Sequence, residues 1–304
     1  MTEPFSVASK IGILEKNVSI ALEYFADCTV CPRQCHVDRT SGELGECAMP
    51  ARLKISSANL HHGEEPPISG TAGSGTIFLS GCNLHCQYCQ NYPISQYGHG
   101  KFYSARETAN MMKSLQNRGA HNINFVTPTH YVPALMEALL LAYRDGLQIP
   151  LVYNSSGFDS LEMLGLLDGI IDIYMPDMRY ADARVAALLS DISDYPQINR
   201  AVIKEMHRQV GVLQTVDGVA QRGLLIRHLV LPDNLAGSAD IFKFIADEVS
   251  RDTHVSVMSQ YFPAYNACHY SQLDRRLTAD EYKAALEAFE KAGLGNGYIQ
   301  PYAH

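Results

Sequence analysis

After residue 70, the hydrophobic and polar positions repeat one pattern: a short, almost wholly apolar run is followed by a helical segment. Runs of this kind are typical of strands that are buried on both faces of a sheet. Six such runs separated by helical segments predict a parallel sheet covered by helices. The predicted strands are residues 76–81, 123–127, 150–154, 170–175, 224–231 and 255–260.

Polar residues mark where several of the helices begin. Ser104 with Glu107 forms a capping box, and Thr278 is placed to start the last helix. Asp159 is expected to cap the helix after the third strand, and Ser238 the helix before the sixth strand.

The repeated units of strand and helix fit an open doubly wound sheet or a full or partial barrel. In both architectures, the loops that leave the carboxyl ends of the strands build the active site.

Residues 1–70 differ from the rest of the chain, because they hold four cysteines and no alternation of strands and helices. We therefore predict two parts. Residues 1–70 form a helical, cysteine-rich metal-binding extension, and residues 71–304 form the α/β domain with its C-terminal helix. A length of 304 residues suits one large domain with a small appendage.

Charge and composition narrow the class of protein. The chain has 24 Lys and Arg against 32 Asp and Glu, a formal net charge of -8, so it lacks the basic balance of most nucleic-acid-binding proteins. No secretory signal pattern and no window apolar enough for a membrane span are found, so we expect a cytoplasmic protein without membrane association. Cysteines in a reducing compartment are better candidates for metal ligands or buried thiols than for disulfides.

Three cysteines stand close together in the stretch GCNLHCQYCQN, directly after the first predicted strand. Cys82, Cys86 and Cys89 can bind three irons of a 4Fe-4S cubane, which normally takes four cysteines, and no fourth lies nearby in sequence. One iron would then be open to a substrate or cofactor, as in catalytic metal sites. The alternatives are a zinc site, for which His85 is wrongly placed, and three buried thiols.

A second group, Cys28, Cys31, Cys35 and Cys47, forms a C-x2-C-x3-C-x11-C array in the extension. Four soft ligands within a short segment make a closed site, for which a structural role is the default. Zinc and a second iron–sulfur cluster both satisfy this spacing. Cys268 is left over and is interpreted as a free thiol.

The three-cysteine loop has the form C-x3-C-x-aromatic-C, with Tyr88 as the aromatic residue, and it resembles the signature of the radical S-adenosylmethionine (radical SAM) superfamily. The resemblance implies a partial (β/α)6 TIM-like barrel, a 4Fe-4S cluster on the three cysteines, and S-adenosylmethionine bound at the open iron near Tyr88. It also implies that one electron from the reduced cluster breaks the carbon–sulfur bond of the cofactor. The 5'-deoxyadenosyl radical so formed abstracts a hydrogen atom, while the protein orients the reactants and excludes water.

The ends of the second to fourth strands give candidates for the S-adenosylmethionine site. Many superfamily members have a Gly-Gly-Glu motif after the second strand, and here VTPTHYVP replaces it. Thr127, Thr129 and His130 could do the same job, with Thr127 and Thr129 as the chosen candidates, or the segment is a plain turn. YNSSGFD and MPDMR resemble the D-T-N-G-F and M-L-D-L-K segments of pyruvate formate-lyase activating enzymes, which contact the cofactor and a nearby monovalent cation. The resemblance therefore implies cofactor contacts by Ser155 and Asp177, although Asn154 replaces an aspartate and Asp177 could instead cap a turn.

The ends of the fifth and sixth strands add three candidates. His228 either touches the adenosyl group or makes a hydrogen bond in the core. Gln260 and Tyr261 follow the sixth strand and are expected to face substrate.

Over nearly its full length the chain is similar to a group of pyruvate formate-lyase activating enzyme-like proteins, with which it shares CPR-C, EEPPISG-GSG, SGCNL-C-YCQN, TPTHYVP and MSQY. This similarity implies a radical enzyme that removes hydrogen from a backbone glycine of a glycyl-radical enzyme.

An alternative function is a radical enzyme acting on a small molecule or another peptide, which the absent Gly-Gly-Glu motif and the extra cysteines favour. Both imply an electron donor such as flavodoxin or ferredoxin. A third alternative, a non-catalytic electron carrier, would need a closed cluster.

Overall fold

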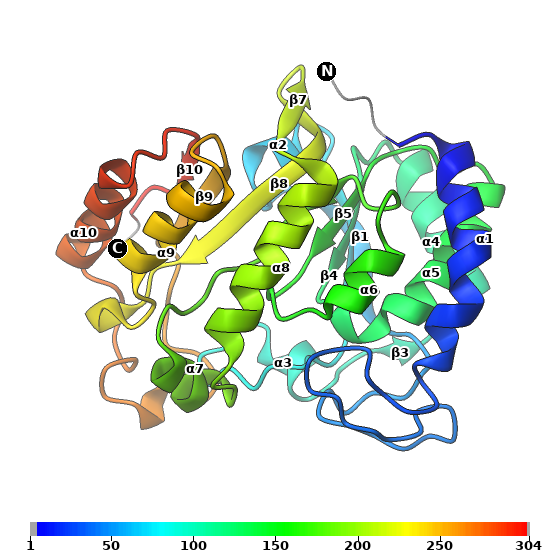
Figure 1. The fold of residues 1–304 in the computed structure, drawn as a ribbon, viewed down its shortest axis with the longest axis horizontal. Coiled ribbons are helices and arrows are strands. Elements are labelled where there is room, and N and C mark those ends of the chain that lie inside the picture. The colour runs from blue at the N-terminus through cyan, green and yellow to red at the C-terminus, as the bar shows by residue number, and fades with distance from the viewer. Residues whose placement is uncertain (1–4, 303–304) are drawn as a thin grey trace.

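The structure is a computed structural model that describes residues 5–302. Its strands form a mostly parallel sheet in the order β10-β9-β8-β6-β5-β4-β2-β1-β3, and β7 pairs with β8 outside this path (Figure 1). The strands are β1 (Lys54–His61), β2 (Ser74–Leu79), β3 (Lys101–Phe102), β4 (Ile123–Val126), β5 (Leu151–Asn154), β6 (Ile173–Tyr174), β7 (Gln214–Val216), β8 (Val219–Leu229), β9 (His254–Met258) and β10 (Gly297–Ile299).

The six strands predicted from the apolar runs are confirmed as β2, β4, β5, β6, β8 and β9, and each is parallel to the next. Every residue of β5 is buried, as expected for a strand covered on both faces. Because helices connect these strands in chain order, the fold is the partial (β/α)6 barrel expected from the sequence. The path of strands has two ends, so the barrel is open.

The two edges of the sheet were not predicted. β1 is antiparallel to β2 and to the short β3, so the expectation that residues 1–70 hold no strand is wrong for Lys54–His61. Only Ile55 of β1 is buried, which explains why its sequence, KISSANLH, shows no apolar run. At the opposite edge, β10 extends the parallel arrangement beside β9.

Helices cover the sheet (Figure 1). The helix α1 packs on α5, which also contacts α4, while α9 packs on α10 at the other end of the sheet. Within the described part of the chain, no helix combines the length and apolar character that crossing a membrane requires. The helices are α1 (Val7–Glu23), α2 (Pro66–Ser69), α3 (Tyr92–Ser95), α4 (Ala105–Asn117), α5 (Val132–Arg144), α6 (Leu161–Leu166), α7 (Ala183–Ser190), α8 (Tyr195–Val210), α9 (Ser238–Phe244), followed by a π turn (Ile245–Val249), and α10 (Ala279–Lys291), with 3-10 turns at Thr129–Tyr131, Pro232–Asn234 and Ala267–His269.

Two of the four predicted caps are confirmed. Complete capping boxes start α4 at Ser104 and α10 at Thr278. The predictions for Asp159 and Ser238 are wrong. The hydroxyl of Ser160, not Asp159, accepts from the first turn of α6, and Gly237, in a left-handed conformation, precedes α9. Both mispredicted side chains are buried and serve hydrogen bonds between elements, which local sequence does not reveal.

Candidate functional site

The three-cysteine loop leaves the carboxyl end of β2. Gly81 precedes it with a φ of 82°, a conformation that glycine adopts without strain. A Cβ atom at Gly81 would lie 2.5 Å from Cγ of Met49 and 2.7 Å from the carbonyl oxygen of Cys47. The loop therefore lies directly against the segment that carries the four-cysteine array.

Cys86 is the most enclosed cysteine of this loop, with 4% of its surface exposed. The Ser190 hydroxyl donates to its sulfur at 2.9 Å, and Nη1 of Arg179 lies 3.8 Å from the same sulfur. Ser190 ends α7 and Arg179 follows β6, so three parts of the barrel meet at this atom. Both donors stabilise negative charge on sulfur.

Burial opposes that charge. It raises the pKa of the Cys82 thiol to about 12 and also raises the pKa of the Cys89 thiol, and the neighbouring Cys86 sulfur acts in the same direction on both. Three neighbouring sulfurs, of which Cys86 is buried and the other two are partly buried, need a positive partner as thiolates because they repel one another. A metal group fits this donor set.

Two adjacent cavities open beside the loop. The first, of about 150 Å³, is lined by Tyr88, Cys89 and polar side chains from the ends of β6, β8 and β9. The second, of about 380 Å³, shares Arg227, Met258 and Gln260 with the first. A molecule in the second cavity would therefore lie next to one bound in the first.

Arg227, on β8, connects the polar groups between these cavities. Its Nε donates to Oδ1 of Asp177 at 2.9 Å, and its Nη2 donates to Oδ1 of Asn154 at 2.8 Å. Its Nη1 lies 3.9 Å from Oε2 of Glu64. Asp177 also accepts from Nη2 of Arg179 at 2.5 Å, so two guanidinium groups hold one carboxylate at the edge of the first cavity.

Asp159 connects the segment after β4 with the end of β5. Its carboxylate is 2% exposed and accepts hydrogen bonds from the hydroxyls of Thr129, Tyr153 and Ser155 at 2.6, 2.7 and 2.7 Å. Burial raises its pKa, while the three hydroxyls favour its ionised form. Hydrogen bonds to one acidic side chain therefore hold Thr129 and Ser155, two of the predicted cofactor contacts, in place.

We predict that Asp159→Asn lowers the free energy of unfolding by about 1–3 kcal/mol, because the amide cannot accept all three hydrogen bonds and leaves a buried hydroxyl unpaired. Urea unfolding followed by circular dichroism measures this loss. Asp217→Asn is the matched control, since Asp217 is exposed in the β7–β8 turn with a φ of 51°, a conformation that asparagine tolerates. Equal stabilities of the two variants would contradict the role assigned to Asp159.

Of the remaining predicted site residues, Tyr88 and Gln260 line the first cavity. Thr127 lies half-buried at the end of β4 with a φ of 61°. His228 is fully buried, with Nδ1 2.8 Å from the carbonyl oxygen of Met178 and Nε2 2.9 Å from Oγ of Ser238, the arrangement expected for a core hydrogen bond. Tyr261 lines neither cavity, and its hydroxyl donates to a carbonyl group.

Comparison with known sequences identifies the family. The model of the Radical SAM superfamily matches residues 76–245, from β2 to the end of α9. The chain belongs to the radical SAM superfamily. Members of this superfamily bind a 4Fe-4S cluster and S-adenosylmethionine, and membership supports radical SAM chemistry for this chain.

Two relatives match most of the chain. Uncharacterized protein MJ0674 of Methanocaldococcus jannaschii is 33% identical over 94% of this chain and 80% of its own length. Uncharacterized protein MJ0808 of the same organism is 22% identical over 78% of this chain and 71% of its own.

One solved structure agrees in fold, and a second is similar over a comparable share of the chain. HydG, the FeFe-hydrogenase maturase from Carboxydothermus hydrogenoformans, superposes with a TM-score of 0.52 and 16% identity over 74% of this chain and 52% of that chain. SuiB of Streptococcus suis gives a TM-score of 0.49 and 10% identity over 75% and 48%. The chain thus spans about half the length of these two structures.

The spacing of the sulfurs fits the superfamily's cluster. Among residues 5–302, the one group of three possible ligand atoms that all lie within 4.8 Å of one another is formed by Glu46, His85 and Asp191 and contains no cysteine. Thiolates on one tetrahedral zinc, with Zn–S bonds of about 2.3 Å, lie only about 3.8 Å apart. Sulfurs that bind different irons of a cluster are further apart. Cys82, Cys86 and Cys89 therefore suit a cluster better than zinc.

Sequence reasoning missed two side chains of the candidate site, Arg227 and Ser190. Arg227 was overlooked although it interrupts the apolar run LLIRHLVL, and a charged residue inside such a run was the signal. Ser190 lies in an ordinary helix end, and nothing local marks its contact with Cys86.

Proposed function

We propose that the protein uses a 4Fe-4S cluster held by Cys82, Cys86 and Cys89 to cleave S-adenosylmethionine reductively and to abstract hydrogen from a substrate. The observation that carries this proposal is the three-cysteine loop beside a cavity lined by Asp177 and Arg179. When bound, the cluster and S-adenosylmethionine supply the electron and the 5'-deoxyadenosyl radical.

The chain's own residues would bind and orient the cofactor. Arg179 lies between the Cys86 sulfur and Asp177, and its buried Nε has no hydrogen-bond partner among the described residues, so it can bind a carboxylate. Asp177 can accept hydrogen bonds from an ammonium or hydroxyl group. Asp159 acts indirectly, because it holds Ser155 and Thr129 in place.

The first candidate target is a backbone glycine of a glycyl-radical enzyme. It is supported by the resemblance of the third and fourth strand ends to those of activating enzymes. The side chains at these two ends, Asn154 and Asp177, share one partner, Arg227. In the activating enzymes the corresponding segments lie near a monovalent cation, and here the Arg227 guanidinium lies between them.

The second candidate is a small molecule or another peptide bound in the 380 Å³ cavity. Glu64 and Glu65 line this cavity, and Oε2 of Glu65 is buried without a partner among the described residues. A buried carboxylate oxygen in this state favours a ligand that donates hydrogen bonds, such as an amine.

The proposal is tested with the full chain, reconstituted anaerobically, reduced with dithionite and mixed with S-adenosylmethionine. We expect release of 5'-deoxyadenosine, measured by liquid chromatography, above the level given by the Cys86→Ala variant. Release equal to that of the variant would contradict the proposal and support an electron carrier.

The target is found by following deuterium. Extracts of cells grown in deuterated medium are separated into protein and low-mass fractions, and each is added to the reaction. Deuterium in 5'-deoxyadenosine from the low-mass fraction alone supports the second candidate. Transfer from the protein fraction alone, with a glycine-centred radical in the electron paramagnetic resonance spectrum, supports the first.

A further inference from the structure

The four cysteines of the extension form a built site. Cys28, Cys31 and Cys47 are 5–7% exposed, and the sulfur of Cys35 accepts from the backbone N–H of Glu46 at 3.4 Å. The chain turns sharply at Gln34, His36 and Ala48, whose φ values are 43°, 53° and 55°. Such left-handed conformations are uncommon outside glycine and concentrate where a structure must place groups against a ligand.

A buried positive charge, Arg39, lies beside these sulfurs. Arg39 is 1% exposed, and its acceptors are the carbonyl oxygens of Met49, Pro50 and His130 and the sulfur of Cys28, 3.8 Å from Nη1. Within the described chain, no carboxylate forms a salt bridge with it. A buried guanidinium needs a negative partner, and a metal–thiolate group supplies one.

The spacing of the sulfurs distinguishes the two metals. The four thiols influence one another electrostatically, Cys31 through Cys28 and Cys47, and Cys47 through Cys28 and Cys35. In the described residues, however, no three of them all lie within 4.8 Å of one another, whereas the ligands of one zinc lie about 3.8 Å apart. Cys82, Cys86 and Cys89, which suit the superfamily's cluster, likewise do not all lie within 4.8 Å of one another.

The two cysteine sites are in contact. Nε of Arg33, two residues after Cys31, donates to the carbonyl oxygen of Asn83 at 3.0 Å. Asn83 is the neighbour of Cys82 in the chain.

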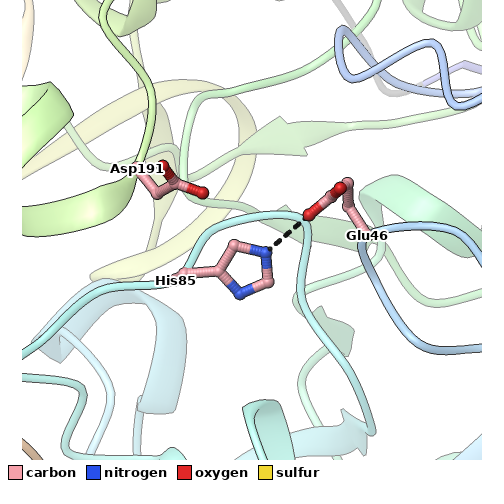
Figure 2. A group of neighbouring side chains, drawn as sticks. All are labelled: Glu46, His85 and Asp191. Carbon is pink, nitrogen blue, oxygen red and sulfur yellow. Dashed lines mark hydrogen bonds and ion pairs between the residues drawn. The ribbon is translucent and has the colours of Figure 1, made fainter.

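A second contact lies on the surface side of the two sites. Figure 2 shows His85, from the three-cysteine loop, pointing toward Glu46, which precedes Cys47, with their atoms 3.1 Å apart. Asp191, at the end of α7, lies on the other side of the imidazole (Figure 2) and is 3.7 Å from Arg33. Residues next to cysteines of both sites are thus held together.

We propose that Cys28, Cys31, Cys35 and Cys47 hold a second 4Fe-4S cluster, not zinc, which relays electrons to the three-cysteine site. One electron from a low-potential, one-electron donor of the flavodoxin or ferredoxin type reduces this cluster. The same electron then passes to the three-cysteine site and is consumed when the carbon–sulfur bond of S-adenosylmethionine breaks. No proton moves in the relay. The site itself is independent of the proposed function, while the relay depends on it.

Metal analysis tests the site. Anaerobically purified full chain is expected to hold about eight irons and eight sulfides and no stoichiometric zinc, and the triple variant Cys82→Ala, Cys86→Ala, Cys89→Ala is expected to keep about four of each with the spectrum of a 4Fe-4S cluster. One zinc per chain, or about four irons in the wild type and none in the triple variant, would overturn the proposal. The iron and zinc contents of the wild type test the proposal even if the triple variant does not fold.

Reduction kinetics test the relay with Cys35→Ser, at the least buried ligand. We expect release of 5'-deoxyadenosine driven by reduced flavodoxin to fall at least tenfold relative to wild type. Release driven by dithionite, which can reach the open iron directly, is expected to fall far less. Equal losses with both reductants would overturn the relay. If the wild type contains zinc and still cleaves S-adenosylmethionine, this inference is rejected and the proposed function is kept. If it holds eight irons but does not cleave S-adenosylmethionine, the second cluster is kept and the proposed function is rejected.

Discussion

Cys86→Ala is expected to remove the iron of the three-cysteine site and to lower 5'-deoxyadenosine release by more than about 100-fold. Loss of a group that hydrogen-bonds to a metal ligand already lowers metal affinity or activity by about 10- to 100-fold. Loss of a ligand itself should therefore lower product release by more. Cys86 is 4% exposed and receives both the Ser190 hydroxyl and the Arg179 guanidinium, so the replacement removes the most enclosed sulfur of the loop. Iron analysis and product chromatography on the same preparation measure both effects.

Cys268→Ala is the matched control. The same atoms are removed, but Cys268 is exposed on the 3-10 turn Ala267–His269, away from both cysteine groups in sequence. Its iron content and product release should equal those of the wild type. A Cys86→Ala variant with wild-type iron and activity would reject the ligand assignment, and equal losses in both variants would point to a general effect of cysteine replacement.

The parallel core was predictable because its strands carry their signal locally. A strand such as β5 is buried at all positions, so its sequence is apolar throughout, and the three-cysteine loop is recognisable from spacing alone. β1 was missed because only Ile55 is buried, and its place in the sheet depends on pairing with β2. Edge strands lack the two-sided burial that produces an apolar run.

The polar framework of the site was harder to predict, because it depends on contacts between distant residues. Asp159 had the features of a helix cap, yet it binds the hydroxyl of Thr129, thirty residues earlier in the chain. Arg227 meets Asn154 across 73 positions. Such pairings depend on the register of the strands, which a single sequence does not state.

The extension is tied to the barrel by a buried ion pair that the sequence did not suggest. Lys10, on α1, is 3% exposed, and its Nζ donates to the carboxylate of Asp172, which is fully buried between β5 and β6 and also accepts from the backbone N–H of Leu151 at 2.8 Å. Burial lowers the pKa of Lys10 and raises the pKa of Asp172, because it disfavours both charges. Each charge is therefore tolerated only because the other is present.

Lys10→Met should lower the free energy of unfolding by about 3–5 kcal/mol, since it keeps the side-chain length but leaves the Asp172 carboxylate buried without its cation. Lys16→Met, at an exposed position of the same helix, should change stability by less than about 0.5 kcal/mol. Anaerobic urea unfolding of both variants gives the comparison. The double variant Lys10→Met, Asp172→Leu should recover much of the loss, because two apolar side chains leave no uncompensated charge. A double variant less stable than Lys10→Met would mean that the Asp172 bond to Leu151, and not its pairing with Lys10, holds this part of the barrel.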